Sequence, residues 1–214
     1  MVQNHLGHKV IEVYDRGGKS IGEGARYHQT RYGAYVHNDG VSDPLPIDYL
    51  ILACGQQALL GGESILIDAS AVYAELMAFP EILEELKCNF FFENRGMSDE
   101  EQLFNAPILS FSNEGIPLIR YFRVYIESAH IKAGVPLTVA QCQALDFLDT
   151  VLDQSSVQQR VLLEPGQVLM AADNKFLHTR TQFIDRNTPR CAIDDTESLS
   201  DLYRYMLRMW VRKQ

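Results

Sequence analysis

Short runs rich in β-branched and aromatic residues lie toward both ends of this chain, and a helical stretch lies between them. The runs before the middle are Val10 to Tyr14, Gly33 to Val36, Tyr49 to Cys54 and Ser64 to Asp68. Asn89 to Glu93 lies within the middle, and Val161 to Leu163 and Val168 to Ala171 follow it, joined tightly at Pro165-Gly166. Their lengths, composition and flanking turn residues predict strands. The pattern predicts a β-rich core with helices added to it, an α+β fold.

The helical middle is indicated by apolar residues at helical spacing. Ala71 to Met77 and Glu81 to Lys87 carry such residues, and Pro80 suits the first turn of the second helix. Thr138 to Leu152 predicts the longest helix, which Thr138 can cap. One face of that helix carries Ala144, Leu145, Leu148 and Leu152.

The composition is that of one folded domain, residues 1–214, with 46% hydrophobic residues. The 19 Lys and Arg residues against 28 Asp and Glu residues give a net charge of −9, which argues against a nucleic-acid partner because such binding needs clustered basic side chains. No apolar run reaches the roughly 20 residues of a membrane-spanning helix, so no membrane partner is expected. Four widely spaced cysteines, without a signal-peptide pattern, indicate free thiols and a cytoplasmic protein. They are Cys54, Cys88, Cys142 and Cys191.

One short motif carries chemistry. His37 and Asp39 lie two residues apart in an extended run, so their side chains point to the same side, and Gly40 lets the chain turn away. Two ligands leave a metal underbound, and His178 offers a third in the turn and strand from Asp173 to Arg180. Two histidines and one carboxylate on one face of a metal, with other positions open, is the arrangement of non-haem Fe(II) oxygenases. We therefore expect one iron bound through His37, Asp39 and His178, with dioxygen as a reactant.

Seven pieces of the sequence, this motif among them, follow one another in a characteristic order. They are His37-Asn38-Asp39-Gly40, Pro46-Ile47-Asp48-Tyr49-Leu50, Gly61-Gly62-Glu63-Ser64, Leu118-Ile119-Arg120-Tyr121, Glu164-Pro165-Gly166-Gln167, the run from Asp173 to Thr181, and the run from Tyr203 to Trp210. Together they resemble the TauD/TfdA and clavaminate-synthase-like family of Fe(II)/2-oxoglutarate-dependent oxygenases. The resemblance spans about residue 26 to the C-terminus. It implies a double-stranded β-helix (jelly roll) core with helices packed on its outside.

The resemblance implies roles for three further residues. 2-Oxoglutarate chelates iron through its keto oxygen and adjacent carboxylate, and an arginine late in the fold holds its far carboxylate in a two-pronged pair. Arg204 stands at the first arginine of the closing R-x-x-x-R pattern and is the expected anchor. Arg208, at the second, is expected nearer the iron-side carboxylate or the substrate. Ser64 stands where the family more often has Thr and supplies a hydroxyl to the cosubstrate.

Periodicity and resemblance disagree over the last part of the chain. Its apolar residues follow helical spacing, and they are Leu199, Leu202, Tyr203, Met206, Leu207, Trp210 and Val211. The family instead places Arg204 and Arg208 on a core strand, with both side chains facing inward. Even spacing also suits a strand, so we adopt the strand.

Three features depart from the family pattern. The stretch from His178 to Arg204 is longer than usual, and Arg190 within a predicted loop from Asp185 to Thr196 is an alternative anchor for 2-oxoglutarate. Only a short N-terminal segment precedes the metal motif, so a substrate-covering part is either missing or supplied by a partner chain. The stretch from Asn94 to Gly115 contains no recognisable motif and lies where the family often has a variable lid.

Several polar residues beside these motifs allow two interpretations. Arg120, Tyr121 and Arg123 follow Pro117 in a predicted strand, and the arginines are either solvated or contact an acidic group of the substrate. Asn174 and Arg180, on either side of His178, are expected to support the ligand turn.

The function implied is hydroxylation of an unactivated C–H bond, coupled to decarboxylation of 2-oxoglutarate to succinate. A small anionic or zwitterionic substrate, such as an amino acid or related metabolite, is expected. Asp39 argues against halogenation, because related halogenases have a small residue at this position. Desaturation and ring formation stay open as reaction types. A homo-oligomer also stays open. The alternatives are a non-catalytic β-helix binding or regulatory protein and a cupin-like metal enzyme that does not use 2-oxoglutarate.

Overall fold

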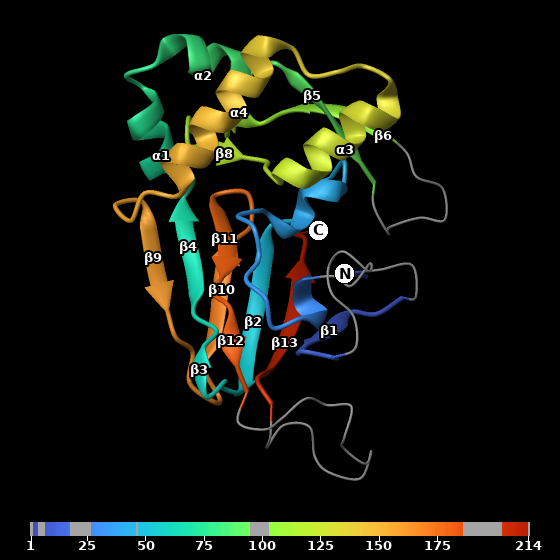
Figure 1. Ribbon diagram of the computed structural model, residues 1–214, viewed down its shortest axis with the longest axis vertical. Coiled ribbons are helices and arrows are strands. Elements are labelled where there is room, and N and C mark those ends of the chain that lie inside the picture. Colours follow the sequence, from blue (N-terminus) through green and yellow to red (C-terminus); the bar gives the residue numbers. More distant parts are fainter. Residues whose placement is uncertain are drawn as a thin grey trace.

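Two antiparallel sheets form the lower part of the molecule, and a layer of helices and hairpins covers one end of them (Figure 1). The computed structural model describes residues 2–3, 7–17, 27–45, 47–94, 103–185 and 203–213. The larger sheet has the strand order β1 (Val10–Val13), β13 (Tyr205–Val211), β2 (Tyr49–Gln56) and β10 (Val168–Ala172). The smaller sheet has the order β11 (Phe176–Arg180), β4 (Ser64–Asp68) and β9 (Gln158–Val161). A short pair joins β3 (Leu60–Gly61) to β12 (Phe183–Ile184).

Alternation along β13 explains why this segment is a strand. Met206 and Trp210 are buried, whereas Leu207 and Met209 between them are exposed. β13 lies between β1 and β2 and pairs with both along its length, so its backbone groups are satisfied by neighbouring strands. Leu50, Leu52 and Met206 of the larger sheet line the same cavity as Ser64 and Leu66 of the smaller one, so the two sheets face one another.

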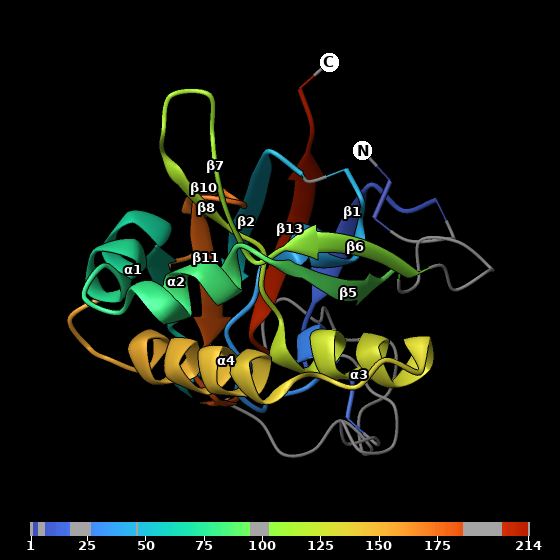
Figure 2. The same ribbon diagram turned by 90° about the horizontal axis from the view of Figure 1, so that it is seen from above.

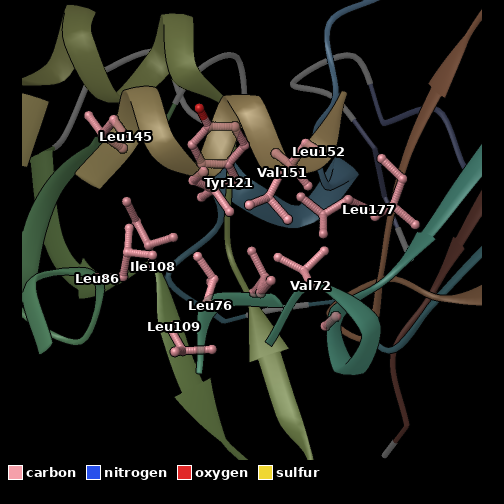
Figure 3. Packing of buried hydrophobic residues seen from close by; sticks show 14 of the residues in the cluster. Val72, Leu76, Leu86, Ile108, Leu109, Tyr121, Leu145, Val151, Leu152 and Leu177 are labelled. Atoms are coloured by element: carbon pink, nitrogen blue, oxygen red, sulfur yellow. The ribbon is translucent and has the colours of Figure 1, made fainter. Parts of the chain in front are cut away.

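The helical layer contains most of the hydrophobic core. Its helices are α1 (Ala69–Leu76), α2 (Pro80–Leu86), α3 (Arg123–Ala133) and α4 (Val139–Leu152), and its hairpin strands are β5 (Asn89–Glu93), β6 (Leu103–Pro107), β7 (Leu109–Phe111) and β8 (Pro117–Ile119). Seen from above, α4 and α3 lie in a row along one side (Figure 2). Leu145 and Leu152 of α4 pack over Leu76, Leu86 and Tyr121 (Figure 3). No helix within the described ranges has the length and apolarity needed to cross a membrane.

Most predicted elements are confirmed. The strands predicted around Val10, Tyr49, Ser64 and Asn89 are present, and so are the helices that begin near Ala69 and Pro80. Thr138 caps α4 with a reciprocal capping box: its side chain accepts from the Gln141 backbone N–H, and the Gln141 side chain accepts from the Thr138 backbone N–H. The predicted apolar face of α4 is fully buried. The strand adopted for the C-terminal run is confirmed over Tyr205–Val211, and the helical alternative is wrong there; Leu199 and Leu202 lie outside the described residues.

Other predictions are wrong for physical reasons. Residues 33–36 follow the edge of β11 without forming a regular strand, because their contacts are isolated ones such as the hydrogen bond from Ala34 N to the carbonyl of Arg180, 3.1 Å. The turn at Pro165-Gly166 does not close a hairpin, since β9 pairs with β4 and β10 pairs with β2 in the other sheet. The described part of the stretch expected to be an irregular lid carries β6 and β7. Its role as a lid stays a prediction, and α3 was not predicted at all.

Two chain segments approach each other closely at Gly61, and a substitution there tests this approach. The φ of Gly61 is +74°, and an added Cβ would overlap the carbonyl oxygen of Gln182. Gly115 is a matched control, with φ +76° and open space around it. Gly115→Ala should lower the free energy of unfolding by about 1–2 kcal/mol, the cost of a left-handed conformation. Gly61→Ala should lower it by roughly 1–3 kcal/mol more because of the overlap. Chemical denaturation measures both, and equal losses would mean that Gln182 does not approach as described.

Candidate functional site

The two histidine ligands of the predicted site are paired through their backbones. The His37 N–H donates to the carbonyl of His178 at 3.0 Å, and the His178 N–H donates to the carbonyl of His37 at 2.9 Å, as in an antiparallel ladder. Since β11 is in turn paired with β4, the smaller sheet holds both residues. The imidazole centroids lie 4.4 Å apart. Residues far apart in the sequence are therefore brought together with their rings on the same side.

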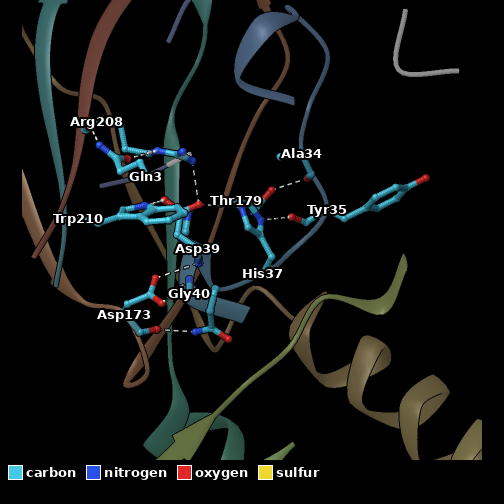
Figure 4. A network of polar contacts seen from close by, with 12 residues as sticks. Gln3, Ala34, Tyr35, His37, Asp39, Gly40, Asp173, Thr179, Arg208 and Trp210 are labelled. Atoms are coloured by element: carbon cyan, nitrogen blue, oxygen red, sulfur yellow. Dashed lines mark hydrogen bonds and ion pairs between the residues drawn. The ribbon is translucent and has the colours of Figure 1, made fainter. Parts of the chain in front are cut away.

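The ligand atoms of the three predicted residues converge. The carbonyl of Tyr35 lies 2.8 Å from His37 Nδ1, which makes Nδ1 the donor of this hydrogen bond and leaves Nε2 as the nitrogen that can bind a metal (Figure 4). Asp39 Oδ1 lies 3.5 Å from His37 Nε2 and 3.8 Å from His178 Nε2. Atoms bonded to one metal at about 2.1 Å and at right angles are about 3 Å apart. For these two pairs an inward shift of less than an ångström would suit a metal ion, and the three ligand atoms all lie within 4.8 Å of one another, in the donor set of a non-haem iron site.

The charges within this group also suit a metal. Burial acts to raise the pKa of Asp39, but the charges around it, that of Arg208 first among them, hold that pKa below its ordinary range, so the carboxylate is ionised. Burial, and then the proximity of His37, lowers the pKa of His178 to about 3, so this imidazole is neutral. An ionised carboxylate and a neutral imidazole are the forms that bind metal ions.

Asp39 has two partners on β13. Arg208 Nη1 donates to Asp39 Oδ1 at 3.0 Å, and Trp210 Nε1 donates to Asp39 Oδ2 at 2.8 Å (Figure 4). The Arg208 guanidinium lies over the Trp210 ring, 4.8 Å from its centroid, and its Nε donates to Gln3. Arg208 therefore lies beside Asp39, and its expected place near the iron-side carboxylate of 2-oxoglutarate or the substrate stays a prediction. Trp210 was predicted only as an apolar residue, because an indole N–H directed at a ligand leaves no signal in the spacing.

Arg204, the predicted cosubstrate anchor, lies just before β13 and is buried at 5% exposure. Its backbone N–H donates to Asp185 Oδ1 at 2.8 Å, and its Nη2 donates to the carbonyl of Gly62 at 3.3 Å. Nη1 is buried and has no hydrogen-bond partner among the described residues. An unsatisfied buried donor on a cation is costly, and a carboxylate would satisfy it. The residues present therefore fit an anionic cosubstrate as well as a metal.

Gly62 and Phe183 determine how the Arg204 side chain lies. An added Cβ at Gly62 would lie 2.8 Å from Arg204 Nε, so a glycine is needed for the close approach. The Phe183 ring centroid lies 5.3 Å from the guanidinium carbon. Burial lowers the pKa of Arg204 to about 10, which still leaves the guanidinium charged at neutral pH.

A cavity of about 170 Å³ joins the metal ligands to the arginine. Ser64, buried at the start of β4, lines it together with Arg204 and Arg208. Its apolar wall consists of Val13, Val41, Leu50, Leu52, Leu66, Leu169 and Met206. The predicted cofactor-binding residues and metal ligands therefore share one cavity between the two sheets.

An aromatic group beside His37 was not predicted. Phe122 lies 5.1 Å from the His37 ring and 4.2 Å from Tyr125, and Tyr27 lies 5.9 Å from Phe122, measured between centroids. Phe122, Tyr125 and Tyr27 all line the cavity. They come from the start of α3 and from a short 3-10 turn, η2 (Tyr27–Gln29), neither of which was predicted.

Three other arginines considered in the sequence, Arg120, Arg123 and Arg180, have structural partners. Arg180 Nη2 donates to the carbonyls of Thr30, at 2.9 Å, and Tyr32, which agrees with its predicted supporting role. Arg123 pairs with acidic side chains of α3 and α4. Arg120 is not solvated as one interpretation had it, because its Nη1 donates to backbone carbonyls beside Asp39. Arg190, the alternative anchor, lies outside the described residues.

Sequence comparisons agree with the resemblance. The model of the taurine catabolism dioxygenase TauD, TfdA family matches residues 3–210. FR-33289 synthase of Streptomyces rubellomurinus is 25% identical over 215 residues, which cover 99% of this chain and 59% of that protein. A uridine-5'-phosphate dioxygenase of an Amycolatopsis species is 29% identical over 164 residues, which cover 75% of this chain and 59% of that protein. The chain thus spans 59% of the length of each of these relatives.

Solved structures share the fold. An asparagine oxygenase in complex with Fe(II), 2S,3S-3-hydroxyasparagine and succinate superposes with a TM-score of 0.71 at 20% identity, over 98% of this chain and 58% of that one. At this identity the likeness establishes the fold alone. The jelly-roll core expected from the sequence is confirmed.

The metal ligands can be tested one at a time. His37→Ala, Asp39→Ala and His178→Ala should each fold but lose stoichiometric iron, because two remaining ligands hold Fe(II) weakly. His28→Ala is the matched control, since His28 also lines the cavity but is not one of the three converging ligands. Metal analysis after anaerobic loading with Fe(II), with circular dichroism as the check on folding, gives the result. Iron retained at the wild-type level by all three variants would rule out this ligand set.

Proposed function

Because the chain belongs to the taurine catabolism dioxygenase TauD, TfdA family, we propose that it is an Fe(II)- and 2-oxoglutarate-dependent dioxygenase. The proposed reaction is hydroxylation of a C–H bond in a small anionic or zwitterionic molecule. The observation that carries the proposal is that one cavity is lined both by the three converging ligands, His37, Asp39 and His178, and by Arg204, whose buried Nη1 has no hydrogen-bond partner within the described ranges. A metal site alone would not require a buried arginine in the same cavity.

The metal ligands, Arg204 and Ser64 each have a part in the proposed reaction. His37, Asp39 and His178 would hold the metal through two imidazoles and one carboxylate. Arg204 would bind the far carboxylate of 2-oxoglutarate, and Ser64 would donate a hydrogen bond to the same group. Bound iron and 2-oxoglutarate supply the oxidation itself, in which dioxygen, 2-oxoglutarate and the substrate C–H give succinate, carbon dioxide and an alcohol. The apolar wall between the two groups excludes water from the reacting centre.

The substrate class rests on the chemistry of the cavity and on the named relatives. Tyr27, Phe122 and Tyr125 give the cavity an aromatic lining of mutually tilted rings, and Arg208 gives it a cation. The relatives include proteins named for a nucleotide, uridine 5'-phosphate, and for asparagine. A small polar metabolite, either an amino acid or a molecule of similar size with an anionic group, is consistent with both observations. An amino acid remains the first class to test.

Succinate formation tests the proposed activity. Wild-type protein is incubated with Fe(II), ascorbate, 2-oxoglutarate and a panel of amino acids, nucleoside monophosphates and other small anionic metabolites. At least one substrate should stimulate succinate release, and the His178→Ala variant should abolish it. Tight binding of iron and 2-oxoglutarate without succinate from any member of the panel would instead support a non-catalytic binding protein.

The anchor is tested with Arg204→Ala. Loss of a buried two-pronged ion pair typically costs about 2–5 kcal/mol, so the concentration of 2-oxoglutarate needed for half-maximal succinate formation should rise roughly 30- to 5,000-fold. Arg160→Ala is the surface control, since Arg160 pairs with Glu63 while largely exposed. Ser64→Ala should raise the requirement roughly 10- to 160-fold, the value of about 1.5–3 kcal/mol for one hydrogen bond to a charged group. If Arg190→Ala has the large effect and Arg204→Ala does not, the anchor lies in the segment after β12.

A further inference from the structure

Asp39 begins a short 3-10 turn, η3 (Asp39–Ser42), whose first N–H groups lack the usual local cap. The side chain of Asn38, the residue before the turn, makes no capping hydrogen bond to it. Instead the carboxylate of Asp173, far along the chain, accepts hydrogen bonds from the first two N–H groups of the turn. The Asp39 N–H donates to Oδ1 at 3.0 Å, and the Gly40 N–H donates to Oδ2 at 2.9 Å (Figure 4). A carboxylate at the start of a helical turn satisfies its free donors and matches its dipole.

The other end of the turn is held by a cation. Arg120 Nη1 donates to the carbonyls of Gly40, Val41 and Asp43 at 3.4, 3.0 and 2.7 Å. Phe92 and Phe104 lie beside its guanidinium, with ring centroids 5.7 and 5.4 Å away, which keeps the arginine in place. A cation at the last carbonyls again matches the polarity of the turn.

Hydrophobic packing does not hold this turn on every side. A second cavity, of about 260 Å³, lies behind it and is lined by Asn38, Gly40 and Val41 as well as by Arg120 and Asp173. Space of this size next to the backbone would let the turn shift if its polar contacts were lost. Gly40 itself is tightly surrounded, since an added Cβ would lie 3.0 Å from Ile47 Cγ1 and 3.1 Å from Asp173 Oδ2.

We propose that Asp173 and Arg120 are positioning residues that together hold the Asp39 turn, and that this hold sets the direction of the Asp39 carboxylate and thereby the affinity of the site for iron. Neither residue is among the three converging ligand residues. The inference rests on the proposed function, because it concerns the same metal site. It assigns a role to Arg120 that differs from both of its sequence interpretations.

Asp173→Asn is the most specific test, because it changes almost no volume. Both carboxylate oxygens accept an N–H, whereas an asparagine would direct its own NH₂ at one of these donors. Fe(II) affinity, measured anaerobically by calorimetry well below the unfolding temperature, should fall roughly 10- to 100-fold. The matched control is Asp68→Asn, because Asp68 caps α1 by accepting from a single N–H, that of Ser70, and asparagine caps equally well. The control should bind Fe(II) like the wild type.

Arg120→Met gives a second, independent variant, which keeps side-chain length but removes the donors. It should weaken Fe(II) binding in the same range, and Arg120→Lys should recover part of the affinity. If Asp173→Asn does not fold, the two Arg120 variants decide the question alone. An affinity that falls only in proportion to the unfolded fraction would reduce both residues to a structural role and overturn the proposal.

The outcomes separate this inference from the function on which it rests. Wild-type protein that binds one Fe(II), together with Asp173→Asn and Arg120→Met variants that bind within twofold of it, would overturn the positioning role and leave the dioxygenase proposal intact. Wild-type protein that binds no Fe(II) would overturn both. Weakened binding in both variants beside an unchanged Asp68→Asn control is the result that supports the proposal.

Discussion

The site depends on one pair of backbone hydrogen bonds, those between His37 and His178. They connect the loop that carries the H-x-D motif to β11, which the smaller sheet already holds against β4. Because directly opposed residues of an antiparallel pair present their side chains on the same face, this pairing places both imidazoles on one side. The turn that follows Asn38 then brings Asp39 to the two imidazoles and completes the set of three metal ligands. Without this pairing, nothing would fix the position of the segment that carries His37 and Asp39 relative to His178.

The larger sheet supplies the charges that face this group. Arg208 and Trp210 both donate to the Asp39 carboxylate, so an entering metal ion must share or replace the contact that Arg208 makes with Oδ1. Arg204, four residues earlier, lines the same cavity with a buried donor that has no hydrogen-bond partner in the part of the chain that the structure describes. Arg208 on β13 and Arg204 just before that strand thus bring two cations to the lining of one cavity. One lies next to the metal ligands, and the other lies where an anion would complete its hydrogen bonds.

Sequence reasoning predicted the residues of the candidate site better than it predicted the strand pairing and the long-range hydrogen bonds around them. His37, Asp39 and His178 were recognisable because ligand chemistry limits which residue types can act. The final strand was ambiguous, since Met206 and Trp210 fit helical and strand spacing alike, and only pairing with β1 and β2 decides between them. The turn at Pro165-Gly166 was correctly located, but no local signal reveals that its two strands enter different sheets. The role of Asp173 was missed because its partners are backbone N–H groups far away in the sequence, although its place in the Asp173-Asn174 turn marked it as polar and near a ligand.

The central claim is that iron and 2-oxoglutarate occupy this cavity together. Anaerobic titration of 2-oxoglutarate into the Fe(II)-loaded protein tests it most directly, by following the visible charge-transfer absorption that arises when the keto oxygen and adjacent carboxylate chelate the metal. The account predicts that this band grows to saturation with one equivalent of 2-oxoglutarate per bound iron. Stoichiometric iron with no such band at any 2-oxoglutarate concentration would contradict it.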